Sequence, residues 1–272
     1  MDELLDVNRT HWDEVTDVHI ASAFYDIATF KAGKERLHSI ELSELGDVSG
    51  KSMLHLQCHF GIDSLSWARH GATVTGVDFS ERAIAAARAL SDELKIPATF
   101  LTSNVYELPE HLEGEFDIVY TSYGVIYWLP DLVRWGRVAG RFVRSGGTFY
   151  IAEFHPVGYM FDTDNGRDPG MVDYVRRYPY FHSAEPIVED VPDYADPNAP
   201  VKNARTFEWA HSLSDVANAL IDAGLQIESV REFPFSVIRQ FHFLEQHDDG
   251  YWYPPQGMHD MPMLFSIKAR KP

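Results

Sequence analysis

The sequence KSMLHLQCHFG at residues 51–61 has the pattern of a buried strand that runs into a tight turn. Its apolar run stops at Gly61, and a helical pattern begins at once with Ile62. A second apolar run over 72–77 ends on Asp78, about twenty positions after the first turn. In a strand–helix–strand unit, a carboxylate at that place accepts hydrogen bonds from a ribose. The two turns together therefore predict a site for a nucleotide-type cofactor.

Strands and helices continue to alternate downstream of this unit. Strands are expected at 51–58, 72–77, 98–102, 116–121 and 148–154, with helices at 62–70, 80–94 and about 130–143. A capping box formed by Ser212 and Asp215 then opens a helix over 213–223, and closing strands follow at 226–235 and 263–269. This order indicates an α/β fold with a doubly wound parallel sheet, in which ligands bind at the carboxyl ends of the strands.

Two segments depart from the alternation. Residues 1–45 combine helical spacing at 7–15 and 35–45 with aromatic side chains among acidic ones, which predicts an N-terminal helical lid. Residues 155–208 are rich in Pro, Tyr and Asp and have no sustained period, which predicts an ordered cap inserted after the fifth strand. We therefore expect one domain with four parts: the lid at 1–45, a cofactor-binding core at 46–154, the cap at 155–208, and a C-terminal helix with closing strands at 209–272.

The composition argues against several classes of function. With 41 acidic and 23 basic residues, the chain has a formal net charge of −18, whereas nucleic-acid partners require basic patches. No apolar run reaches the roughly 18 residues of a membrane span, and no secretory segment is visible at the start. The single cysteine, Cys58, fits a reduced compartment, and the cytoplasm is expected. The 13 histidines show no metal-binding spacing, so no metal is expected.

Taken together, these elements resemble the class I S-adenosylmethionine-dependent methyltransferases. The first motif of that family places an acidic residue among apolar ones before a Gly-Cys-Gly-x-Gly turn, and LHLQCHFG at 54–61 is similar to it. Cys58 and Gly61 match, whereas His55, Gln57 and His59 stand where Asp, Gly and Gly are more common. The set LHLQCHFG, GVDFS and YTSYGV also resembles a bacterial subgroup of the family. The resemblance implies a seven-stranded Rossmann-like sheet whose last strand is antiparallel.

Other segments resemble the later motifs of the family. GVDFS at 76–80 places Asp78 at the ribose and Phe79 against the adenine, and SNV at 103–105 resembles the adenine-contacting motif, with Asn104 in place of Asp. The segments at 116–132 and 144–154 resemble the fourth and fifth motifs. The implied cofactor is S-adenosylmethionine. Its expected contacts are Gln57, Cys58, His59, Gly61, Asp78, Phe79, Asn104, Val105 and Thr121.

Methyl transfer is an in-line displacement, so a base is needed only if the nucleophile carries a proton. Glu153 and His155 lie two positions apart at the end of the fifth strand and point to the same side, which makes both candidate bases. The alternative for His155 is a structural turn before Pro156. His59 either contacts the cofactor carboxylate or the substrate, or is a helix-entry residue hydrogen-bonded to the backbone.

The substrate pocket is expected where the lid and the strand ends meet. Its candidate residues are His19, Tyr25, Tyr123, Tyr127 and His211. Packing or capping is the alternative role for His211, and the tyrosines are expected to shape the pocket rather than ionise. Aromatic walls favour an aromatic or apolar small molecule as the partner.

Three functions remain open at this point. The first is a methyltransferase (EC 2.1.1.-) that acts on an unidentified small molecule. The second is a non-catalytic protein that binds S-adenosylmethionine. The third is a nicotinamide-dependent oxidoreductase, for which the turn HFGIDS lacks two glycines of the GxGxxG fingerprint. The sequence leaves the methyl acceptor and the number of subunits open.

Overall fold

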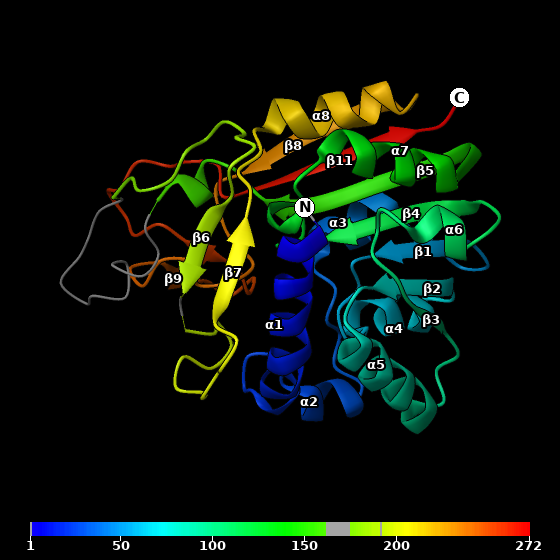
Figure 1. The fold of residues 1–272 in the computed structure, drawn as a ribbon, viewed down its shortest axis with the longest axis horizontal. Helices are drawn as coiled ribbons and strands as arrows, with labels where there is room; N and C mark the ends of the chain where they lie inside the picture. The colour runs from blue at the N-terminus through cyan, green and yellow to red at the C-terminus, as the bar shows by residue number, and fades with distance from the viewer. Residues whose placement is uncertain (1, 162–174, 191) are drawn as a thin grey trace.

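The computed structural model describes residues 2–161, 175–190 and 192–272, and its centre is a seven-stranded sheet (Figure 1). The strands lie in the order β3 (Thr99–Thr102), β2 (Thr73–Asp78), β1 (Ser52–Leu56), β4 (Phe116–Ser122), β5 (Val143–Phe154), β11 (Leu264–Arg270), β8 (Gln226–Phe233). The first five are mutually parallel. The last strand in the chain, β11, runs antiparallel between β5 and β8. The predicted α/β fold class is confirmed.

Helices cover both faces of this sheet. On one face lie α7 (Leu132–Phe142) and α8 (Leu213–Asp222), with α6 (Leu108–His111) beside them; on the other lie α4 (Ile62–Arg69) and α5 (Glu81–Leu94). Alternate residues of β1 point to opposite faces of the sheet. Leu54 packs in the cluster that includes α7 and α8, and Met53 packs with Trp67 of α4. The sheet is therefore buried on both sides, as a parallel sheet requires.

Several element boundaries differ from the sequence prediction for local reasons. Strand β1 ends at Leu56 rather than at residue 58, because Gln57 has a left-handed backbone with φ 55°. Helix α3 (Ser39–Leu45) begins four residues later than predicted. The Glu35 side chain accepts the backbone N–H groups of Arg36 and Leu37, and Glu41 accepts that of His38, so these donors are satisfied outside a helix.

The N-terminal segment forms a long helix, α1 (Asp2–Ala21), followed by α2 (Ile27–Lys31) and α3. Helix α1 lies between α5 and a two-stranded hairpin of the cap, β6 (Ile187–Asp190) and β7 (Arg205–Glu208), as Figure 1 shows. The Asn8 amide both donates to and accepts from the backbone of Phe207, at 2.7 and 2.8 Å. Glu14 accepts the N–H groups of Lys202 and Asn203. Side chains of α1 therefore hold the cap backbone in place.

The cap contains regular structure that the sequence pattern did not indicate, namely the β6–β7 hairpin. Part of the predicted cap, residues 162–174, lies outside the described residues. A second small hairpin, β9 (Glu245–Gln246) with β10 (Trp252–Tyr253), occupies the excursion between β8 and β11. None of the helices described in the structure is both long enough and apolar enough to cross a membrane.

Helices α7 and α8 approach each other closely at Gly136. A Cβ atom placed on Gly136 would collide with the backbone carbonyl of Ala219, which has no freedom to move away. Glycine is otherwise unfavourable inside a helix by about 1 kcal/mol relative to alanine. The close contact between the two helices therefore outweighs helix propensity at this position.

We expect Gly136→Ala to lower the free energy of unfolding by roughly 1–3 kcal/mol, because the added methyl overpacks the α7–α8 contact. Urea denaturation followed by circular dichroism measures this change. Gly158→Ala is the matched control, since the nearest atoms to its Cβ belong to the Gln240 side chain at 3.7 Å. A Gly136→Ala protein as stable as wild type would contradict the close-packing account.

Candidate functional site

A cavity of about 1440 Å³ lies at the carboxyl ends of β1, β2 and β4. The turn after β1 and the turn after β2 form its floor, and residues of α1, the cap and the β8–β11 excursion complete its walls. Small-molecule pockets commonly measure roughly 300–1,000 Å³. This cavity therefore has room for a cofactor together with a second molecule.

The turn after β1 keeps a left-handed backbone without the usual glycines. Gln57, His59 and Gly61 have φ values of 55°, 50° and 78°. A residue other than glycine raises the free energy of the folded state by roughly 1 kcal/mol in this conformation. Gln57 and His59 both carry this conformational cost. Gly61 is required on a second ground, because a Cβ there would lie 2.7 Å from the ring of Phe100. The chain therefore retains the glycine-type turn geometry and adds two side chains to it.

Asp78 fixes this turn through the backbone. Its carboxylate accepts the N–H of His59 at 2.8 Å and the N–H of Ser80 at 2.9 Å. Burial raises the pKa of Asp78 to about 6, and the nearby charge of Asp13 acts in the same direction, against the two hydrogen bonds. A carboxylate has about four lone-pair sites, so acceptor capacity remains toward the cavity that Asp78 lines.

Most of the predicted cofactor contacts come together at this cavity. Its lining includes Gln57, Cys58, His59, Gly61, Asp78, Phe79, Asn104 and Val105. Thr121 is not among the described residues that line it. The Thr121 hydroxyl is buried and donates to the carbonyl of Leu56 at 3.2 Å, so it bridges β4 to β1 instead.

The predicted pocket residues divide into two groups. Tyr25, Tyr123 and Tyr127 line the cavity, and Tyr127 stacks on Tyr159 with ring centroids 3.7 Å apart. His19 and His211 are absent from the described lining. The ring of His211 is buried, with Nε2 2.6 Å from the carbonyl of Leu129, which assigns it a packing role.

The two candidate bases also lie behind the cavity wall rather than in its described lining. Glu153 is fully buried and accepts the backbone N–H groups of Gly124, Val125 and Ile126, so it shapes the loop after β4. His155 has Nδ1 at 3.1 Å from the N–H of Val157 and Nε2 at 2.8 Å from the Glu232 carboxylate. Both side chains are occupied by structural contacts, so the geometry supports neither as the base.

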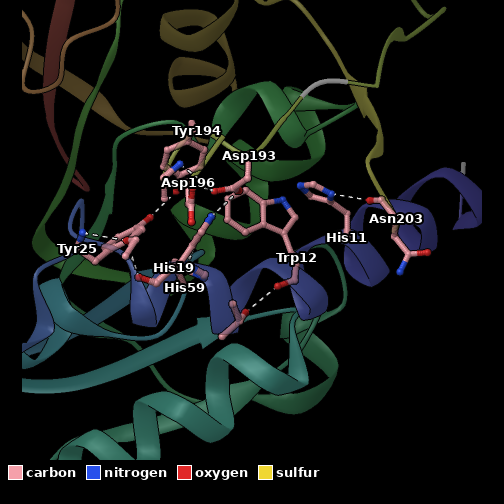
Figure 2. A network of polar contacts seen from close by, with 12 residues as sticks. His11, Trp12, His19, Tyr25, His59, Asp193, Tyr194, Asp196 and Asn203 are labelled. Carbon is pink, nitrogen blue, oxygen red and sulfur yellow. Dashed lines mark hydrogen bonds and ion pairs between the residues drawn. The ribbon is translucent and has the colours of Figure 1, made fainter. Parts of the chain in front are cut away.

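A chain of three polar side chains joins segments that are distant in sequence, and the sequence analysis did not identify it (Figure 2). His19 of α1 places Nδ1 at 2.8 Å from Nε2 of His59, and its own Nε2 at 2.8 Å from Oδ2 of Asp193 in the cap. Burial opposes ionisation of Asp193, but hydrogen bonds from His19 and from two backbone N–H groups lower its pKa overall. Burial lowers the pKa of His59, so its ring is neutral near pH 7.

Two acids near the β4 loop, one partly and one fully buried, were also missed. Asp63 lines the cavity, accepts a hydrogen bond from Ser122 at 3.5 Å, and has a pKa raised by burial to about 6. Glu41 lies behind Tyr123, whose hydroxyl donates to it at 3.0 Å. Burial raises the pKa of Glu41 to about 8, and the charge of Asp63 adds to the effect. The residues described in the structure include no group of three or more His, Cys, Asp or Glu side chains able to hold a metal ion.

Glu41 makes the stability of the protein depend on pH. Its pKa is about 8 in the folded protein against 4.5 in the unfolded chain, so its contribution to stability is complete below pH 4.5 and is lost as the pH rises toward 8. We expect Glu41→Gln to remove this decline in the free energy of unfolding, which amounts to roughly 3–5 kcal/mol. Urea unfolding between about pH 5 and pH 8 measures it. Glu115→Gln, at an exposed ion pair with Lys271, is the control. Equal pH slopes in wild type and Glu41→Gln would exclude this coupling.

Part of this chain is similar in sequence to known proteins. Residues 54–151 match the family model described as a methyltransferase domain. A ubiquinone biosynthesis O-methyltransferase of Pseudomonas paraeruginosa is 30% identical over 122 residues, which make up 44% of this chain and 52% of that relative. An uncharacterised methyltransferase of Synechocystis sp. is 32% identical over 133 residues, or 47% of this chain and 59% of that protein. The chain thus spans little more than half the length of these curated relatives.

Solved structures share the fold over a longer stretch. An S-adenosylmethionine-dependent methyltransferase from Mesorhizobium loti superposes with a TM-score of 0.58 and 23% identity, covering 89% of this chain and 100% of that one. The glycopeptide N-methyltransferase MtfA, in complex with S-adenosylmethionine, gives a TM-score of 0.52 at 15% identity, covering 86% of this chain and 92% of its own. Residues 54–151 thus resemble a methyltransferase domain, and the strand order of the sheet is that of the class I methyltransferase fold.

Proposed function

We propose that this protein is an S-adenosylmethionine-dependent methyltransferase that acts on a small molecule. The observation that carries the proposal is the position of Asp78: its carboxylate fixes the turn after β1, lines the cavity and keeps acceptor capacity for ribose hydroxyls. The family match covers this same strand–turn–helix–strand segment. The antiparallel placement of β11 further favours a methyltransferase over a nicotinamide-dependent oxidoreductase.

The cofactor would be held by residues from three strand ends. Asp78 would accept the ribose hydroxyls, Phe79 would pack against the adenine, and Asn104 and Val105 would bound the adenine from the turn after β3. When bound, S-adenosylmethionine supplies an electrophilic methyl group on a sulfonium. The protein's task is then to bring a nucleophile into line with that methyl and to keep water out.

The remaining volume of the cavity has aromatic walls. Tyr123, Tyr127 and Tyr159 line it from the β4 loop and the start of the cap, and Tyr25 lines it from the segment after α1. These walls support an aromatic or apolar small molecule as the methyl acceptor. A relative bears the name of an O-methyltransferase of ubiquinone biosynthesis, which is compatible with such an acceptor.

Asp63 is placed to accept a proton from the nucleophile, where the acceptor carries one. Unlike Glu153 and His155, it is among the residues that line the cavity, and its pKa of about 6 leaves it mostly ionised near pH 7. We assign it the role of general base in place of the two residues that the sequence had suggested.

We expect wild-type protein to bind S-adenosylmethionine and S-adenosylhomocysteine in isothermal titration calorimetry, and Asp78→Asn to bind both about 10- to 100-fold more weakly. The loss corresponds to a hydrogen bond between a charged carboxylate and the ribose, worth roughly 1.5–3 kcal/mol. Asp222→Asn, which removes an exposed carboxylate at the end of α8, is the charge-matched control. Absence of binding by the wild type would refute the proposed function, and unchanged affinity in Asp78→Asn would remove Asp78 from the ribose role.

A further inference from the structure

The β6–β7 hairpin of the cap, which lies beside α1 (Figure 1), turns one of its faces toward the cavity. Residues directly opposite each other in an antiparallel pair share a face of the sheet. The register pairs Ile187 with Glu208 and Glu189 with Thr206, and all four residues line the cavity. The hairpin therefore presents two carboxylates, one hydroxyl and one apolar side chain to the cavity.

The charges on the two faces of the hairpin are balanced differently. On the outer face, Asp190 is paired with Arg205 at 2.9 Å. On the inner face, Oε2 of Glu189 lies 4.0 Å from Nη2 of Arg177, and Glu208 has no described cation as a partner. Burial raises the pKa of Glu208 to about 7, and the charge of Glu189 acts in the same direction. Glu208 is therefore a carboxylate of the cavity wall that lacks a counter-ion in the described part of the chain.

Two aromatic rings lie next to Glu208. The backbone N–H of Trp209 donates to the carbonyl of Tyr127 at 2.8 Å, which places Glu208 beside Tyr127, and Tyr127 stacks on Tyr159. Burial raises the pKa of both tyrosines, and the charge of Glu208 adds to the effect, so both rings stay neutral. Neutral aromatic faces attract cations. The rings and the carboxylate therefore favour the same kind of ligand group.

Two polar oxygens of this region also lack partners among the described residues. Thr206 is 3% exposed, and its Oγ1 makes no hydrogen bond, although its proximity to Glu208 opposes the rise of that pKa. Oε1 of Gln240 is buried without a partner, 3.8 Å from the position that a Cβ on Gly158 would occupy, next to Tyr159 in the sequence. Both oxygens can accept hydrogen bonds. Buried acceptors without partners indicate a ligand that supplies donors.

The groups around Glu208 define the chemistry of that ligand. An ammonium group carries a positive charge and several N–H donors, so it can pair with a carboxylate and with neutral oxygens at the same time. A metal ion fits less well, because no group of three His, Cys, Asp or Glu side chains in the described part of the chain could hold one. The neighbouring aromatic rings favour an organic cation.

We propose that the methyl acceptor is an aromatic or apolar amine whose ammonium group binds Glu208, with Thr206 and Gln240 as further hydrogen-bond acceptors. This inference rests on the proposed function and deepens it by naming the class of acceptor. An ammonium nitrogen has no lone pair, so the methyl goes to another atom of the same molecule. Glu208 is thus a specificity-determining residue, and Asp63 keeps its role at the nucleophile.

Two pairs of probes separate charge from shape, namely 2-phenylethylamine with 2-phenylethanol and tryptamine with tryptophol. Within each pair, an ammonium group replaces a hydroxyl. At pH 8, Glu208 is mostly ionised, and an alkylamine with a pKa of roughly 10 is still protonated. Each probe is titrated by calorimetry into protein saturated with S-adenosylhomocysteine. We expect wild type to bind each amine at least about 10-fold more tightly than the matching alcohol.

Glu208→Gln removes the charge and keeps the size of the side chain. We expect it to weaken both amines by about 10- to 100-fold and to change both alcohols by less than about threefold. Its affinity for S-adenosylhomocysteine should stay within about threefold of wild type, which also shows that the variant is folded. Asp190→Asn is the matched control, because it removes a carboxylate from the outer face of the same hairpin. We expect it to leave the binding of all four probes unchanged.

The outcomes separate the inference from the proposed function. If wild-type protein does not bind S-adenosylhomocysteine, the proposed function itself fails. If wild type binds it but prefers neither amine to its alcohol, the assignment of an ammonium site to Glu208 is overturned. Equal weakening of amines and alcohols in Glu208→Gln, no weakening of either, or loss of S-adenosylhomocysteine binding would also overturn it. An equal loss of amine affinity in Asp190→Asn would attribute binding to the net charge of the protein, with the same consequence.

Discussion

The cavity is built on the hydrogen bond from the backbone N–H of His59 to the Asp78 carboxylate. It joins the turn after β1 to the end of β2 and holds a backbone in which Gln57, His59 and Gly61 are all left-handed. Two of these residues carry side chains, so the turn bears a conformational cost of roughly 1 kcal/mol at each. Partly buried contacts offset that cost: Gln57 donates to the carbonyl of Val125, and the His59 ring joins the chain to His19.

The lid and the cap depend on each other as well as on the core. Helix α1 supplies the Asn8 and Glu14 side chains that pair with the cap backbone, and the cap supplies Asp193, which fixes the His19 ring of α1. Inside the core, the buried Glu153 carboxylate likewise holds a loop in place, because it accepts hydrogen bonds from the backbone N–H groups of the loop after β4. Carboxylates thus organise the cavity walls by accepting backbone hydrogen bonds, a use that fits the acidic composition.

Local patterns were enough to predict the sheet and the position of Asp78, because strand and helix periodicities and the two turns are encoded within short windows. Local patterns did not predict which side chains form the walls of the site. Glu153 and His155 do lie at the end of β5, but the hydrogen bonds of Glu153 to loop 124–126 and the ion-pair contact of His155 with Glu232 decide where their side chains point. The contact of His19 with Asp193 spans 174 positions in the sequence, and no local signal marks it.

A crystal structure of the protein with S-adenosylhomocysteine tests the central claim most directly. The account predicts a nucleoside seated on the turn after β1, with its ribose hydroxyls within hydrogen-bonding distance of the Asp78 carboxylate. A nucleoside bound elsewhere in the cavity, with Asp78 making only its present contacts to His59 and Ser80, would contradict it.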